Sequence, residues 1–477
     1  MLYNLIKKEF LEHVLGFRFL VSCILCLGMV TTSVFILRGD YINRLRMYEV
    51  NMDSSEEQIR SENSLSRLSK HGVRVDARPG PMQIPVFGLE KDHRIALVTG
   101  KHFPEFEQDR SLNPIGEIFP VADMLFVVAT ILSLLAFVVS YDAVSGEREN
   151  GTLRLLMSYA VPRDVVILGK WFGGYLSLIT PFVMAAVIAA LILLISPEVG
   201  FSMDDWVSYL LVVVVSLLLL AAVFSVGLFV STLCREGSTS IAVLIFLWVT
   251  GILIVPNNSP FIASVFVQTA SPTEIENEVR SDRIAFTNQQ HRTVYAPAQE
   301  DFTKRLHNAK SAEEKKEISE ERDQFKRELI ADIAKEEMER EGRIRKPHDK
   351  VLMSQIGLSQ GLSRFSPVAN FVYAATDIAT TGMQCHFDYR DALENYSQDF
   401  RTYINDNWKK GSGGGLGKKK EEKKEFDAAG MPKFNYTPPS IEERLSNSLL
   451  DIGSLAGCTI LFFLAAFITF IRKDLLG

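Results

Sequence analysis

Six segments of this chain are strongly apolar and almost free of charged side chains, and they constrain the fold more than any other feature. A helix needs roughly 20 apolar residues to cross the hydrocarbon core of a bilayer. The chain is 47% hydrophobic and 23% charged, so its charges must be concentrated between these segments. The pattern predicts an α-helical integral membrane protein with six transmembrane helices, at residues 19–37, 120–140, 175–195, 206–230, 241–255 and 449–471.

The N-terminal segment, residues 1–18, precedes the first span. Its apolar side chains recur at intervals of three and four, which places them on one face of a helix; they are Tyr3, Ile6, Phe10, Val14 and Phe17. We expect an amphipathic helix that lies in the membrane interface. A charged N-terminal tail is the alternative.

Two polar blocks separate the spans. Residues 38–117 are expected to form a small α/β domain, with a helix over 44–70 and a short strand at QIPVF, residues 83–87. Residues 257–448 are expected to form a larger, mostly helical domain. Its charged part, 271–346, has a sparse apolar stripe, which indicates a solvated helix or a helical hairpin, and residues 411–425 are a flexible charged linker.

The end of the fifth span is open to two interpretations. Pro256, Asn257, Asn258 and Pro260 follow its apolar run and are expected to interrupt the helix. The next residues, Phe261–Ala270, are again apolar and are a candidate re-entrant segment.

Lys and Arg residues set the expected orientation. They occur in the N-terminal helix, in residues 141–170, in the turn at Arg235 and at Arg472, whereas the acidic turn 196–205 carries none. Basic loops stay on the cytoplasmic side. Both termini are therefore expected in the cytoplasm and both polar blocks outside it. The mild net charge of −6 indicates no nucleic-acid partner, and the five cysteines do not suggest a disulfide framework.

The loop 141–170 between the second and third spans is the principal candidate site. Asp142, Glu147 and Glu149 precede Gly151-Thr152, where a short helix can begin, and carboxylates there suit the positive end of a helix. Pro162 then ends that helix. The residues alone allow either a short helix on the membrane surface or a plain connecting loop.

The segment ERENGTLRLLMSYAVPRDVVILGKW resembles the cytoplasmic loop of membrane subunits of type 2 ATP-binding-cassette (ABC) transporters. The matching residues are Glu147, Glu149, Gly151, Thr152, Leu153, Pro162, Gly169 and Lys170. RPGPMQIPVFGLE and SRFSPVANFVYAATDIATTG resemble segments of the subgroup with large extracytoplasmic insertions. The resemblance implies a multi-pass protein of the bacterial cytoplasmic (inner) membrane.

The same resemblance implies a separate ABC-type ATPase subunit that binds ATP and Mg. The loop, with Asp142, Glu147, Glu149 and Lys170, would transmit the closure of that subunit to the spans. Two ATPases and two membrane chains would form the complex, so this chain is expected to form a homodimer or to pair with a related permease, within the lipid membrane.

The chain itself is expected to have no catalytic residue, cofactor or metal site. A phosphate loop needs G-x-x-x-x-G-K-[ST], and neither Gly417-Lys418 nor Gly169-Lys170 completes it. The G-x-S-x-G match at Gly357–Gly361 lacks a preceding strand pattern and is interpreted as chance.

Two further features lie in the spans. Gly453 and Gly457 form a small-residue pair on the sixth span that could allow a close helix contact or face lipid. Asp123 and Asp451 lie at the outer ends of the second and sixth spans. They could line an exit or bind a cation, but we expect them to be simply solvated.

The sequence leaves three functions open. The chain could be a permease that couples ATP hydrolysis by its partner to export. It could transmit mechanical work to a periplasmic partner without moving a solute. It could also be a membrane-anchored scaffold or sensor without an ATPase.

Overall fold

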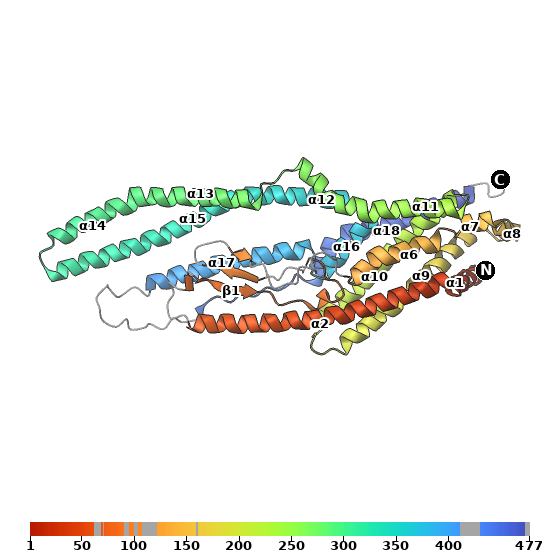
Figure 1. Ribbon diagram of the computed structural model, residues 1–477, viewed down its shortest axis with the longest axis horizontal. Coiled ribbons are helices and arrows are strands. Elements are labelled where there is room, and N and C mark those ends of the chain that lie inside the picture. The colour runs from red at the N-terminus through yellow and green to blue at the C-terminus, as the bar shows by residue number, and fades with distance from the viewer. Residues whose placement is uncertain are drawn as a thin grey trace.

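The protein is a long rod of helices (Figure 1). Its computed structural model describes residues 1–61, 68–69, 71–89, 95–99, 104–106, 122–158, 161–410 and 430–472. The N-terminus and the last turn of the final helix lie together at one end, which we call the terminal end (Figure 1). The opposite, distal end is a hairpin of long helices. The predicted linker 411–425 and the predicted start of the second span at Pro120 lie outside the described residues.

Six helical segments of the described chain are long and apolar enough to cross a membrane, which confirms the predicted fold class. The first is in α2 (Phe17–Ser61). The second comprises α5 (Met124–Phe126), η2 (Val127–Leu132), α6 (Ser133–Ser140) and α7 (Ser145–Glu149). The others are α9 (Arg163–Leu194), α10 (Met203–Leu233), α11 (Gly237–Trp248) with η3 (Val249–Ile254) and α12 (Val255–Phe266), and α18 (Ile441–Arg472).

Helix α10 forms the centre of the bundle. Of its most apolar stretch 61% is buried, against 11% for the α11–α12 segment and 17% for α18. Two of its serines bond within the helix: Ser216 Oγ donates to the carbonyl of Val212 and Ser225 Oγ to that of Ala221, each at 2.7 Å. The α11–α12 segment and α18 therefore lie at the edge of the bundle and turn most of their apolar surface outward.

The fifth span continues past the end that its prolines predict. Gly237–Phe266 is one helical segment, so the expected interruption at Pro256 is wrong, and Phe261–Phe266 belongs to the helix. A π-helical turn, Val249–Ile254, ends two residues before Pro256. Such a wide turn lets a helix accept a residue that lacks an N–H.

Helix α2 also extends beyond its apolar run. Its 45 residues form the first span and then continue to Ser61 in the distal part. The polar residues after Leu37 end the apolar run but do not break the helix, because most of them are good helix formers.

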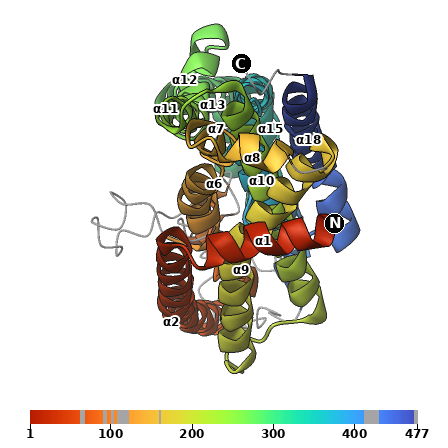
Figure 2. The same ribbon diagram turned by 90° about the vertical axis from the view of Figure 1, so that its right-hand side faces the viewer.

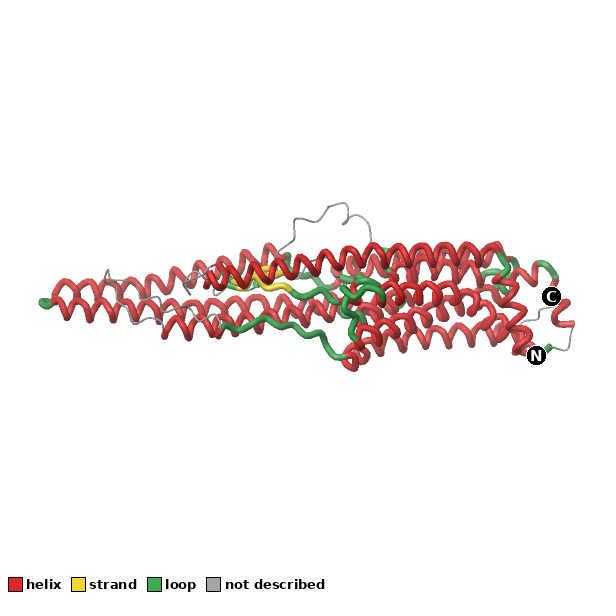
Figure 3. The backbone as a smooth tube through the Cα atoms, turned by 90° about the horizontal axis from the view of Figure 1, so that it is seen from below, coloured by secondary structure: helices red, strands yellow, loops and turns green. Residues whose placement is uncertain are grey.

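The two polar blocks share one hydrophobic core and are not separate domains. Strands β1 (Val73–Asp76), β2 (Ile95–Val98) and β3 (Glu105–Phe106) form an antiparallel sheet in that order. Helix α17 (Met383–Lys410) supplies the other half of this core. The strands, yellow in Figure 3, lie among the long helices of the distal part. The shared core comprises Leu68, Val73, Val75, Ala96, Val98, Leu393, Tyr396, Phe400 and Ile404.

The predicted strand QIPVF is not a strand. Pro81–Gln83 forms a short 3-10 helix, η1, and the next residues are turn and irregular structure. Pro85 cannot donate to a strand ladder, which explains the difference. Ile84 and Val86 are instead fully buried against the bundle.

The charged part of the second block forms the hairpin that was one of the two alternatives. Helices α13 (Pro272–Gln290) and α14 (Ala296–Asn308), joined by η4 (His291–Tyr295), pack along α15 (Ala312–Ser363). Near the tip, the rings of Phe302 and Phe325 lie 5.8 Å apart. Nearer the bundle, Arg340 donates two hydrogen bonds to Asp282, at 2.8 and 2.9 Å.

The chain then returns to the bundle through α16 (Pro367–Ile378), so the second block does not lie wholly apart from the spans. Asp451 on α18 is 1% exposed and accepts hydrogen bonds from Arg364 at 2.7 and 3.1 Å. Asp123 is also buried, and it accepts from the backbone N–H groups of Phe87 and Phe126, each at 2.8 Å. The expected solvation of the two aspartates is therefore wrong.

Candidate functional site

A buried ion-pair cluster lies at the terminal end. Lys170 on α9 is almost fully enclosed, and its Nζ lies 2.7 Å from Glu147 Oε1 and 3.2 Å from Glu9 Oε1. Glu9 belongs to α1 (Leu2–Val14) and Glu147 to α7. One ammonium group therefore joins the N-terminal helix, the candidate loop and the third span.

Two glycines of α9 allow this arrangement. Figure 2, which looks onto the terminal end, shows α1 crossing α9. A Cβ at Gly169 would lie 2.5 Å from Leu5 Cδ2, and one at Gly173 would lie 2.5 Å from Glu9 Cβ. No side chain fits at either position, so α1 can approach α9 closely and bring Glu9 to Lys170.

The position of Glu9 corrects one part of the sequence interpretation. Glu9 is not part of the apolar pattern of residues 1–18, yet it is 6% exposed, whereas Tyr3, which is part of that pattern, is 73% exposed. Helix α1 therefore turns part of its polar face toward the protein. The cause is Lys170, 161 residues away, which no local pattern reveals.

The loop is also fixed to α10 and α11. Ser231 Oγ accepts hydrogen bonds from the backbone N–H groups of Val144 and Ser145, at 3.0 and 3.1 Å. Glu149 Oε2 accepts from the N–H of Gly237 at 3.0 Å, which satisfies one of the open donors at the N-terminus of α11. Arg148 donates to the carbonyl of Cys234 at 2.6 Å.

Asp142 forms a further connection, to the start of α2. Its Oδ2 lies 2.8 Å from Arg18 Nη1, and the second Arg18 nitrogen donates to the hydroxyl of Tyr141 at 2.8 Å. The Arg18 guanidinium also lies over the Tyr141 ring, 4.9 Å from its centroid.

On the neighbouring α1, burial lowers the pKa of His13.

A second short helix, α8 (Thr152–Ser158), follows α7 and lies on the outer surface of the terminal end (Figure 2). Gly151 has φ +73°, a conformation that favours glycine, and it redirects the chain between the two helices. Leu153 is buried in a cluster with Val166, Ile167 and Phe470. Leu155, in contrast, is 61% exposed.

The remaining predicted site residues lie as follows. Pro162 is the N-cap of α9 and carries no side-chain bond there. Thr152 Oγ1 donates to the carbonyl of Glu147 at 3.2 Å. Gly453 and Gly457 face away from the rest of the described chain: a Cβ at either position would have no atom of that chain within 4 Å.

The structure thus brings Asp142, Glu147, Glu149 and Lys170 to one end and binds them to helices on every side. Glu9, Arg18 and Ser231 are partners that the sequence interpretation did not single out. The G-x-S-x-G match at Gly357–Gly361 lies inside the long helix α15, which is not the strand-to-helix turn that a nucleophile requires.

Six membrane-crossing helices, with a short helical loop bound to the bundle through buried charges, define a multi-pass α-helical membrane protein. The chain belongs to the ABC-2 family of transporter proteins, whose family model matches residues 3–475. It is similar to a probable ABC transporter permease protein NosY of Pseudomonas aeruginosa, with 39% identity over 80 residues, 17% of this chain and 29% of that protein.

A second similar protein is the probable ABC transporter permease protein NosY of Stutzerimonas stutzeri. Its identity is 38% over 53 residues, 11% of this chain and 19% of that protein. The chain thus spans less than a third of the length of these two curated relatives.

Proposed function

We propose that this chain is the permease subunit of an ABC transporter, and that its terminal end receives a separate ATPase subunit that binds ATP and Mg. The observation that carries the proposal is the Lys170 cluster. Through it, a force on the loop would reach α7, α9 and α1 together, because separating buried opposite charges is strongly unfavourable. Permease is also the term in the names of both similar proteins.

Helix α8 is the proposed contact with the ATPase. It is exposed, it carries the apolar side chain of Leu155 on its surface, and Gly151 sets its direction. Arg148, Arg154 and Arg163 lie on the same loop, and this charge supports a cytoplasmic location for the terminal end. The distal part would then lie outside the cytoplasmic membrane.

The complex would contain two membrane chains and two ATPases, with this chain as a homodimer or paired with a related permease. The outward-facing surfaces of α11–α12 and α18, including Gly453 and Gly457, are available for such pairing within the membrane. In this proposal the transporter exports its substrate from the cytoplasm.

Co-purification of the ATPase tests the contact. Gly151→Ala strains the backbone without any steric contact, because nothing lies within 4 Å of its Cβ position. Gly200, in the turn between α9 and α10, has φ +64° and is equally open, so Gly200→Ala is a matched control. We expect Gly151→Ala and Glu147→Gln to reduce the bound ATPase, and Gly200→Ala to leave it unchanged.

A second pair of variants tests the surface of α8. Leu155→Glu places a charge in the proposed contact, and Ile330→Glu places one at an exposed site on α15, which is 45% exposed. Only the first should release the ATPase. Equal binding by all these variants would contradict the proposed contact on the loop. Failure of any ATPase to co-purify with the wild-type chain would instead favour a membrane-anchored scaffold or sensor without an ATPase.

Mechanical transmission to a periplasmic partner is the second candidate function, and the continuity of α2 favours it. The same helix forms the first span and lines the core of the distal part, so a movement of the span reaches that core directly. A cavity of about 1040 Å³, lined mainly by charged side chains, lies between parts of α13, α15 and α17. An ion pair of 2.7 Å between Asp349 on α15 and Arg390 on α17 joins the hairpin to the distal core at this cavity, so a movement of that core would reach the hairpin.

A shortened hairpin separates the two functions. Removal of residues 292–332, with a short Gly-Ser turn joining the ends, preserves the pairing of Thr287 with Glu337 and of Asp282 with Arg340. Vesicles that contain the shortened chain and its ATPase are then assayed for ATP-driven movement of candidate lipids, peptides or drugs. If the chain is an exporter, the shortened chain should still move the solute. If it transmits mechanical work, both the shortened and the full-length chain should support ATP hydrolysis without moving any solute.

A further inference from the structure

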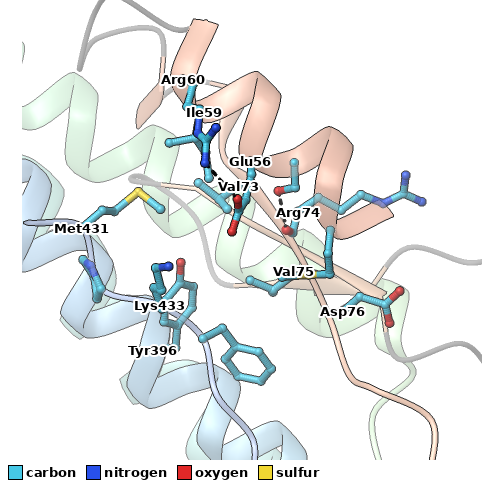
Figure 4. Close-up of a pocket in the computed structure, with 14 residues that line it drawn as sticks. Glu56, Ile59, Arg60, Val73, Arg74, Val75, Asp76, Tyr396, Met431 and Lys433 are labelled. Carbon is cyan, nitrogen blue, oxygen red and sulfur yellow. Dashed lines mark hydrogen bonds and ion pairs between the residues drawn. The ribbon is translucent and has the colours of Figure 1, made fainter. Parts of the chain in front are cut away.

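The distal part contains an apolar cavity that the proposed coupling function does not use. Its volume is about 350 Å³, and it opens to solvent between α2, β1, α17 and residues 431–434 (Figure 4). Six of the apolar side chains that line it are Ile59, Val73, Val75, Tyr396, Met431 and Phe434. All six belong to the shared distal core or pack against it, so the cavity is a part of that core that the chain itself does not fill.

The chemistry of the lining selects an apolar ligand. An apolar cavity does not hold water well, and ligand sites of this size are typically apolar with a few polar groups that fix orientation. Two methionines, Met52 and Met431, are among the lining residues. Their flexible side chains adapt to an irregular hydrocarbon chain.

The lining also includes three basic side chains, Arg60, Arg74 and Lys433, and two acidic ones, Glu56 and Asp76, so the basic groups are in excess by one. Lys433 is exposed at the edge of the cavity, and within the described part of the chain no hydrogen bond or ion pair involves its ammonium group. Arg60 lies on the opposite side, 3.4 Å from Glu56 one turn back (Figure 4). A ligand with an anionic end can therefore place that end between Arg60 and Lys433 and its apolar part among the core side chains.

We propose that this cavity binds a single acyl chain that ends in an anionic group. The place of the cavity supports this ligand class. Met52 follows the predicted end of the first span, Leu37, by about 22 Å of helix, at 1.5 Å per residue. The site is thus close to a source of acyl chains but beyond the hydrocarbon core, and an acyl chain in it has left the bilayer.

The bound chain would lie between two segments that lead into the membrane. One wall belongs to α2, which continues into the first span, and another belongs to residues 431–434, which precede α18. Occupancy therefore would tie the distal ends of the first and sixth spans together through the apolar ligand.

Photolabelling of the full-length protein in lipid nanodiscs tests the site. The probe is hexadecanoic acid that carries a diazirine in its chain, and labelled peptides are identified by mass spectrometry. We expect adducts on residues 52–60 and 431–434. Adducts confined to the membrane spans would overturn the proposal.

Two variants with matched controls make the result specific. Met431→Trp fills the cavity and should weaken probe binding about tenfold, the affinity carried by two buried methylene groups. Met353→Trp on α15 should have no effect. Lys433→Glu should weaken binding of the acid about threefold, as expected for an exposed ion pair, but leave binding of the matching alcohol unchanged, and Lys350→Glu on α15 should change neither.

Met431 packs against the shared distal core, so Met431→Trp also changes that packing. Lys433→Glu, a change at an exposed position, is therefore the decisive variant. Equal labelling in wild type and both cavity variants would refute the site. Separate arms with the free acid, a phospholipid and an acylated peptide, each with the same diazirine chain, identify the source of the chain. Stronger competition by an unacylated apolar peptide would also refute the acyl-chain assignment.

Discussion

Removal of the Lys170 charge should destabilise the protein more than removal of either carboxylate that it binds. The cluster holds two carboxylates and one ammonium group in a buried place, with distances of 2.7 and 3.2 Å. Lys170→Met keeps the length of the aliphatic chain but leaves Glu9 and Glu147 facing each other without a counter-charge. Glu9→Gln instead leaves one intact, neutral pair.

The expected magnitudes follow from these charges. Loss of one partner from a buried ion pair costs about 3–5 kcal/mol, because a buried charge remains uncompensated. Loss of one charged hydrogen bond from a cluster that stays paired costs about 1.5–3 kcal/mol. The triple variant Glu9→Gln, Glu147→Gln, Lys170→Met removes every charge and should recover most of the stability, since apolar or neutral replacements of buried pairs are often tolerated.

The assay is unfolding in mixed detergent micelles with increasing SDS, followed by tryptophan fluorescence. The expected order of stability is wild type, then Glu9→Gln, then Lys170→Met, with the triple variant above Lys170→Met. Equal stability of Lys170→Met and wild type would refute the buried cluster. A triple variant as unstable as Lys170→Met would show that Lys170 acts through packing and not through charge.

Three further outcomes are expected. Glu149→Ala removes the acceptor of the Gly237 N–H and should cost about 1 kcal/mol, as loss of a helix N-terminal partner does, which SDS unfolding measures. Arg364→Ala leaves Asp451 buried without its partner and should cost about 3–5 kcal/mol in the same assay, with Arg364→Lys as the milder control. Burial raises the pKa of Asp377 to about 6, above its unfolded value of about 3.9, so its contribution to stability is complete below pH ~4 and is lost as the pH rises through 6. Melting temperatures from pH 4 to 8 should therefore fall more steeply for wild type than for Asp377→Asn.

The membrane part could be predicted from sequence because its cause is local. A long run of apolar residues is removed from water whatever the rest of the chain does. The six spans and the fold class therefore follow from the distribution of apolar residues along the sequence. The ends of the spans are less predictable. Polar residues after Leu37 mark the end of the apolar run, but they are compatible with a helix, and α2 continues to Ser61.

The candidate site could be predicted only in part, for the opposite reason. The loop residues Glu147 to Leu153 form a contiguous pattern, but their partners are distant in sequence. Lys170 binds Glu9 across 161 residues, and this contact depends on the close crossing at Gly169 and Gly173. The shared distal core has the same character, since β1 and α17 lie more than 300 residues apart.

The uninterrupted α2 has a geometric consequence for any motion of the first span. The 24 residues from Arg38 to Ser61 extend about 36 Å beyond the apolar run, at 1.5 Å per residue. A rigid tilt of about 5° around Leu37 would displace Ser61 by roughly 3 Å at that length. An angular change too small to open a path between the spans would thus be amplified at the far tip of the helix into a displacement comparable to a hydrogen-bond length.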